Sequence, residues 1–173
     1  MLGFQKNTSW KIRPARVIAR DPANWWRNVR IDLGKGHGLR TDLPVLTAEG
    51  LVGRVSEVSE NFARVVLLGD PNCRVSIVVH DPQSRKDVDT GWIGTGVGVL
   101  DESMVELSLY SGSSAVKPGH LVFTSGLGGV FPRGIPIGQV VDTRPVEFGL
   151  YSVARVKLAV RLNLLEEVWV MMP

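Results

Sequence analysis

The sequence has few of the residues that build disulfides and metal sites, and it has no long apolar run. It has one cysteine, Cys73, among 173 residues, so no disulfide can form within the chain. Its three histidines, His37, His80 and His120, follow no recognised spacing of metal ligands. No apolar run approaches the roughly 20 residues that a membrane-spanning helix needs. We therefore expect no metal and no other cofactor.

The excess of positive charge is small overall but concentrated near the N-terminus. Twenty Lys and Arg face 17 Asp and Glu, and a net charge of +3 is too small to imply nucleic acid. The segment from Lys11 to Arg40, however, holds eight basic residues against Asp21 and Asp32. Two interpretations stay open: a solvated strand face, or a binder of anionic surfaces through the Arg13–Arg40 basic region. We expect no nucleic-acid partner.

Apolar residues recur mainly with a period of two, which predicts β-strands. In residues 153–162, for example, Val156, Leu158 and Val160 alternate with Lys157 and Arg161. The high content of glycine (19) and proline (10) favours many turns and short strands. Helical patterns are short and confined to DPANWWRN and LNLLEE. Further strands are expected in ARVIAR, NVRIDL, LPVLT, LVGRVSEV, ARVVLLG, RVSIVVHD, GWIGTGV, MVELSLY, HLVFT, IGQVVDT and the closing EEVWVMM.

A repeated pattern divides these strands into two sets. Residues 38–55 resemble residues 119–140, with Thr47 matching Thr124 and Gly53 matching Gly138. Because closing a sheet into a barrel removes its exposed edges, two related barrels are expected. We predict an all-β fold of two small six-stranded β-barrels of chymotrypsin-like architecture, with short helical turns. Barrel one is placed at 12–73, completed by about 150–172, and barrel two at 74–148.

A serine in the glycine-rich string TSGLGGVFPRGIP raises the possibility of a degenerate or active chymotrypsin-like serine hydrolase that uses Ser125. Such a nucleophile needs a histidine base and a group that orients the base. His120 is only five residues away along the chain, and the sequence lacks the Gly-Asp-Ser-Gly-Gly context of those proteases. We therefore interpret Ser125 as a turn residue. The glycines of the same region are assigned to the shape of the loop: Gly126, Gly128, Gly129, Gly134 and Gly138.

Several strings, in order, resemble the rod shape-determining MreC family. The similarity runs from about Ala15 to Val170 and includes the most distinctive string of that family, TSGLGGVFPRGIPIGQV. LEEVWV resembles the closing strand of the family. The other matching residues are Asp21, Pro22, Trp25, Trp26, Ile31, Asp32, Gly34, Pro44, Val45, Gly50, Leu51, Val52, Gly53, Val55, Asp70, Pro71 and Asn72.

The resemblance implies a non-enzymatic scaffold of the bacterial cell-wall elongation complex, with two barrels and no working triad. It implies binding and activation of an elongation-specific penicillin-binding transpeptidase, action with MreD and RodA, and self-association. It also implies a periplasmic location, anchored to the inner membrane by a segment absent from this chain. The sequence is therefore expected to be the periplasmic part of a longer protein.

Two candidate contact patches are expected on such a scaffold, because aromatic residues and arginine are enriched in binding surfaces. The first is Phe131, Pro132 and Arg133 at the tip of the glycine loop. For Phe131, plugging the end of its own barrel is an equal alternative. The second is Trp25 and Trp26, for which packing between the barrels is the alternative.

Overall fold

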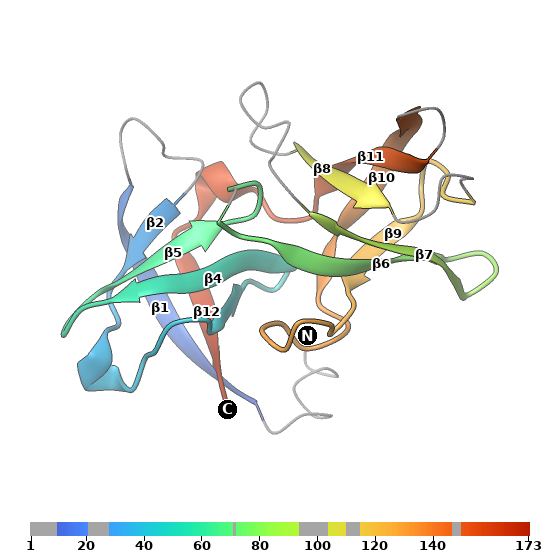
Figure 1. Cartoon of the computed structure of the whole chain (residues 1–173). Helices are drawn as coiled ribbons and strands as arrows, with labels where there is room; N and C mark the ends of the chain where they lie inside the picture. Colours follow the sequence, from blue (N-terminus) through green and yellow to red (C-terminus); the bar gives the residue numbers. More distant parts are fainter. Residues whose placement is uncertain (1–9, 21–27, 71, 94–103, 110–114, 147–149) are drawn as a thin grey trace.

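The computed structural model describes residues 10–20, 28–70, 72–93, 104–109, 115–146 and 150–173. These residues form two closed antiparallel barrels of six strands each, lying side by side (Figure 1). The predicted fold class is confirmed. Two single-turn 3-10 helices, Lys35–His37 and Leu162–Leu164, are the helical elements of the described part, and the second falls within the predicted LNLLEE segment.

Barrel one takes five consecutive strands from the N-terminal half and one strand from the C-terminus. Around the barrel the order is β1-β12-β3-β4-β5-β2. The returning strand β12 pairs with β1 on one side and with β3 on the other. The strands are β1 (Lys11–Arg20), β2 (Asn28–Ile31), β3 (Pro44–Leu46), β4 (Leu51–Val58), β5 (Ala63–Leu67) and β12 (Glu167–Met172).

Barrel two is continuous in sequence and longer than predicted. Its order is β10-β11-β8-β7-β6-β9, so β11 belongs here and not to barrel one. The predicted boundary near residue 148 is therefore wrong: β11 aligns with β10 from Gly138↔Leu158 to Val146↔Tyr151, and only β12 returns. The strands are β6 (Val75–Asp81), β7 (Lys86–Ile93), β8 (Met104–Leu109), β9 (Leu121–Thr124), β10 (Pro136–Val146) and β11 (Tyr151–Leu158).

The two barrels share one arrangement in which a single strand has changed its place in the chain. Read from β7, barrel two runs β7-β6-β9-β10-β11-β8, which matches β1-β12-β3-β4-β5-β2 strand for strand. The position of β6, the first strand of barrel two, is filled in barrel one by β12, the last strand of the chain. This explains why barrel one cannot close without the C-terminus.

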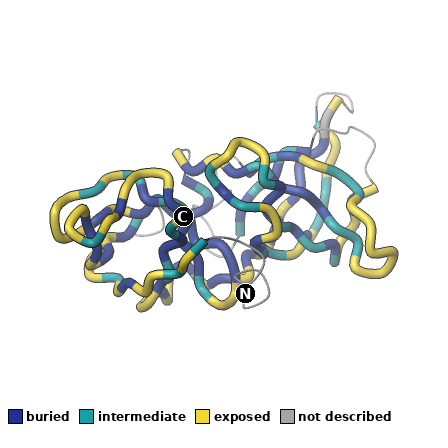
Figure 2. Tube along the Cα trace, turned by 90° about the horizontal axis from the view of Figure 1, so that it is seen from below, coloured by how far each residue is buried: buried dark blue, intermediate teal, exposed yellow. Residues whose placement is uncertain are grey.

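Alternation along the strands fills the interior of each barrel with aliphatic side chains. In β9, Val122 and Thr124 are buried while Leu121 and Phe123 face outward and are half-buried. The buried side chains of both barrels join one core, and exposed residues gather in turns and outer strand positions (Figure 2). No helix among the described residues is long and apolar enough to cross a membrane.

Candidate partner-binding surface

The loop between β9 and β10 is held by the side chain of Thr124, the last residue of β9. Its Oγ1 donates to the carbonyl of Pro132 at 2.5 Å and accepts from the N–H of Ile135 at 2.9 Å. Thr124 is fully buried. The threonine hydroxyl therefore satisfies two backbone groups of the loop, the Pro132 carbonyl and the Ile135 N–H.

Four glycines of this loop adopt positive φ angles. The φ values are +84° at Gly126, +90° at Gly128, +76° at Gly129 and +95° at Gly134. L-residues with a side chain rarely adopt this region. Gly138 differs, because its φ is not in this region and its need for glycine comes from the close carbonyl of Lys157.

Ser125 lies inside the loop as a turn residue. Its N–H donates to the carbonyl of Ser76 at 3.0 Å, and its Oγ accepts from the N–H of Leu127 at 3.2 Å. His120, the nearest histidine in sequence, accepts from the N–H of Lys117 through Nδ1, and its Nε2 lies 3.8 Å from Asp81. Within the described residues, no histidine or carboxylate hydrogen-bonds Ser125. This geometry lacks the base that a serine nucleophile needs.

The three residues predicted at the loop tip have separate environments. Phe131 is only 5% exposed and belongs to the core, which matches the alternative in which it plugs its barrel. Arg133 is exposed and Pro132 is half-buried. The exposed hydrophobic side chain of the loop is Leu127, at 65%. Trp25 and Trp26 lie outside the described residues.

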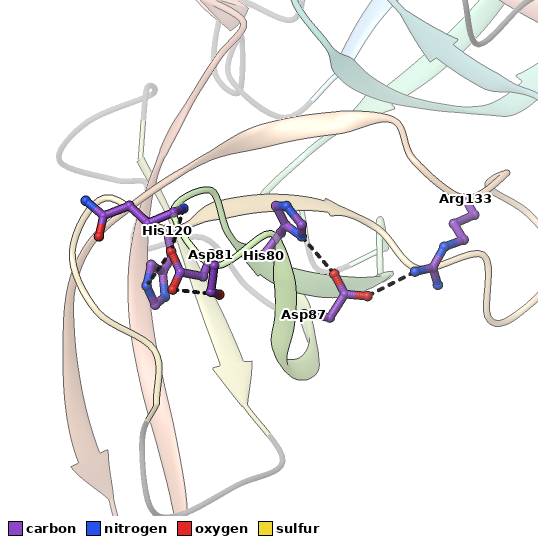
Figure 3. A network of polar contacts seen from close by, with 7 residues as sticks. His80, Asp81, Asp87, His120 and Arg133 are labelled. Atoms are coloured by element: carbon purple, nitrogen blue, oxygen red, sulfur yellow. Dashed lines mark hydrogen bonds and ion pairs between the residues drawn. The ribbon is translucent and has the colours of Figure 1, made fainter.

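Arg133 ties the loop to the β6–β7 hairpin through a shared carboxylate. Its Nη2 lies 3.1 Å from Oδ2 of Asp87, whose Oδ1 is 3.0 Å from Nδ1 of His80 (Figure 3). The neighbouring Asp81 accepts backbone N–H bonds, first from Gln83, which lower the pKa of its carboxyl group. These polar groups border the outer face of barrel two.

A half-buried aromatic residue, Phe123, lies between two hollows on that outer face. One hollow, of about 310 Å³, is lined by Val78, Thr124, Gly134 and the His80–Asp87–Arg133 network. The other, of about 370 Å³, is lined mainly by apolar groups. Its lining residues are Leu121, Val122, Phe123, Pro136, Gly138, Gln139, Lys157, Leu158 and Ala159.

A third hollow, of about 520 Å³, lies where barrel one meets the segment that follows β11. The turn of barrel one that lines it, at Thr47–Gly50, packs so closely on Pro136 that a Cβ at Gly50 would overlap the Pro136 carbonyl. Leu164, which is 60% exposed, and half-buried Trp169 supply apolar surface. The lining residues are Thr47, Ala48, Glu49, Ala159, Val160, Arg161, Leu164, Leu165, Glu166, Glu167 and Trp169.

Two arginines of the basic region donate hydrogen bonds to backbone carbonyls in the described part of the chain. Arg13 donates to the carbonyl of His37 at 3.0 Å, and Arg20 to the carbonyl of Leu165 at 3.3 Å. Arg16 lies opposite Glu167 in the backbone register of β1 and β12, without an ion pair between their side chains. No group of three or more candidate ligands that could hold a metal occurs in the described part of the chain.

Together these features define a double β-barrel protein with a structural serine in its glycine loop and a grooved outer surface. The family described as "Rod shape-determining protein MreC, barrel core" matches residues 17–172. The chain belongs to this family, as the sequence resemblance implied.

Curated relatives and solved structures support the same family membership. The chain is 35% identical over 145 residues to the cell shape-determining protein MreC of Listeria monocytogenes, covering 83% of this chain and 47% of the relative. It is 33% identical over 166 residues to that of Bacillus subtilis, covering 89% and 54%. The chain thus spans about half the length of the curated relatives it matches.

Among solved structures, MreC of Listeria monocytogenes superposes with a TM-score of 0.84 at 32% identity, covering 98% of this chain and 80% of that one. A structure described as a complex between penicillin-binding protein PBP2 and MreC from Helicobacter pylori gives a TM-score of 0.68. It is 19% identical and covers 94% of this chain and 98% of that one, so this likeness shows the fold alone.

Sequence reasoning missed four residues that line the three hollows, namely Phe123, Ala159, Leu164 and Trp169. Their signal was weak, because single apolar residues are common on protein surfaces. One clue was available in LVFT, where large apolar residues occupy both faces of a short strand.

Proposed function

We propose that this chain is the barrel core of a non-enzymatic periplasmic scaffold of the bacterial cell-wall elongation complex. It binds an elongation-specific penicillin-binding transpeptidase and activates it. In the full-length protein this core is anchored to the inner membrane and acts with MreD and RodA. It also associates with further copies of itself.

The observation that carries the proposal is the family match across both barrels, from residue 17 to residue 172. The relatives are cell shape-determining proteins, and one structural neighbour is described in complex with a penicillin-binding protein. The outer grooves supply apolar surface bordered by polar groups, which is the usual composition of a binding patch.

Activation by a scaffold requires no bond chemistry in the scaffold. A protein that binds the active conformation of its partner more tightly than the inactive one shifts the population toward the active form. A shift from 1:99 to 99:1 needs a difference of about 10⁴-fold in affinity. Binding to the transpeptidase is therefore the first property to measure.

The test is a calorimetric titration of this chain with the periplasmic part of the elongation transpeptidase from its own organism. We expect saturable binding, and an increase in the transpeptidase's turnover when the complex forms. A folded chain that shows no heat of binding at high micromolar concentration would contradict the proposal.

A fluorophosphonate probe separates the scaffold from the hydrolase alternative. The probe labels an activated serine, and Ser125 has its hydroxyl engaged by the N–H of Leu127. We expect no labelling of the native chain. Labelling that is lost in Ser125→Ala would favour the enzyme instead.

A further inference from the structure

We propose that the three hollows form one continuous groove, which receives an extended segment of the partner protein in a single orientation. The proposal rests on the proposed function for the identity of the partner, and goes beyond it by naming the surface, the chemistry of the segment and its direction.

Continuity follows from residues shared between neighbouring hollows. Phe123 lines both hollows on the outer face of barrel two. Ala159 lines both the second of these and the hollow at the barrel junction. Ala159 is exposed, and its N–H donates to the carbonyl of Ile137 at 2.9 Å, which fixes it beside β10. The groove therefore crosses from barrel two to barrel one at this alanine.

The shape suits a polypeptide. The barrel-two part crosses β6, β9, β10 and β11, which are neighbours in that order. Three spacings of roughly 4.8 Å give about 14 Å, the length of about four extended residues. The junction hollow lengthens the path further. A groove of this length, open along the surface, matches a peptide segment better than a compact ligand.

Apolar side chains supply contact points along the path. Phe123 lies between the two hollows of barrel two, and Leu164 and half-buried Trp169 lie in the junction hollow. The small residues Gly138 and Ala159 lie between these side chains and leave the hollow open there. Large apolar groups in partly buried positions are the residues that dominate binding energy at interfaces.

The charges beside the groove give the segment its direction. Lys157 is exposed and lines the apolar hollow of barrel two, and it forms no ion pair with a described residue. The junction hollow is lined by Glu49, Glu166 and Glu167 together with Arg161, so it holds three carboxylates and one guanidinium, and none of the four forms an ion pair with a described residue. By contrast, Arg133 and Asp87 already neutralise each other. The partner segment therefore carries acidic residues near Lys157, and basic residues in the junction hollow, where the net charge is negative.

The test blocks the groove at the residue that joins its halves. Ala159→Arg places a long side chain at the crossing, and Ala19→Arg makes the same change at an exposed alanine of β1. Both variants and the unchanged chain are titrated calorimetrically with the transpeptidase, after circular dichroism and thermal unfolding show that each is folded. Lys157→Glu, which alters charge without bulk, is titrated in parallel.

We expect Ala159→Arg to weaken binding by at least about tenfold, Lys157→Glu by about threefold or more, and Ala19→Arg hardly at all. Unchanged binding by both groove variants would overturn the groove and leave the proposed function intact. Absence of binding by the unchanged chain would overturn the proposed function, and the groove's assignment with it. If Ala159→Arg fails to fold, Lys157→Glu decides the question.

Discussion

Gly53 of β4 and Gly138 of β10 occupy equivalent places in the two barrels. A Cβ on Gly53 would overlap the carbonyl of Val66 in β5, and a Cβ on Gly138 would overlap the carbonyl of Lys157 in β11. Each glycine lets the neighbouring strand approach closely, and the two close contacts lie at equivalent positions of the two barrels. The repeat seen in the sequence is thus a repeat of a tight strand contact.

Replacing Gly138 with alanine should destabilise the chain through this contact. Backbone atoms would have to move, which typically costs about 1–3 kcal/mol. Gly128→Ala is the matched control, because its φ is +90° but no atom lies within 4 Å of the added Cβ. It should show only the cost of left-handed backbone, about 1–2 kcal/mol. Urea unfolding measures the loss of stability of both variants. A smaller loss for Gly138→Ala than for Gly128→Ala would contradict the close-contact argument.

Thr124 and Thr47 mark equivalent hairpins but differ in burial, so their replacement should differ too. Thr124→Val removes the hydroxyl that serves Pro132 and Ile135, leaving buried backbone groups unsatisfied at about 1–3 kcal/mol. Thr47→Val removes two exposed hydrogen bonds with Glu49, one to its carboxylate and one from its N–H, and should change stability by about 0.5 kcal/mol or less. Chemical denaturation of the two variants should rank them in this order; a reversed order would argue against the role of Thr124.

Phe131→Ser should act on folding before it acts on binding. Its side chain is in the core, and removing a buried phenylalanine costs about 3–5 kcal/mol. Leu127→Ser, in the same loop but 65% exposed, should cost about 0.5 kcal/mol or less. Thermal unfolding distinguishes them. A Phe131→Ser variant as stable as the parent would show that this phenylalanine is not packed as described.

Cys73 should be an unreactive thiol in the native chain. It is fully buried, and burial raises its pKa to about 12. Ellman's reagent should therefore react slowly at pH 8 in buffer and rapidly in denaturant, because the thiolate is the reactive form. Rapid labelling of the folded chain would contradict its burial.

The same pKa shift predicts a loss of stability at alkaline pH. The folded state keeps the thiol proton up to pH 12, whereas the unfolded chain releases it near its ordinary pKa of about 8.5–9. The contribution of the Cys73 thiol to the free energy of unfolding is thus fully present below about pH 8.5, and it falls as the pH rises toward 12. At pH 10.5 the parent should have lost about 2 kcal/mol more than Cys73→Ala, relative to pH 8.

The sequence predicted the barrels because each strand is short and alternating, and because a barrel removes the edges that such strands would expose. It misplaced β11, since the 153–162 pattern alternates equally well in either barrel. Only the register with β10, from Gly138↔Leu158 onward, decides the matter. Pairing between distant segments carries no local signal.

The surface is harder to predict from the sequence than the fold. Its aromatic side chain suggested Phe131 as a partner contact. The exposure of that side chain, however, depends on how the loop folds back onto Thr124. The hollows are lined by residues from β6, β7, β9, β10 and β11, from the segment after β11 and from barrel one, so no single motif in the sequence could reveal them.

The most direct test of the account is photocrosslinking in living cells of the source organism. A photoreactive amino acid replaces Ala159 in the full-length protein, and Phe62, in the turn between β4 and β5 of barrel one, serves as the control position (Figure 1). The account predicts a crosslink from position 159 to the elongation transpeptidase, identified by mass spectrometry, and none from position 62. Crosslinking of the transpeptidase from position 62 but not from 159 would contradict it.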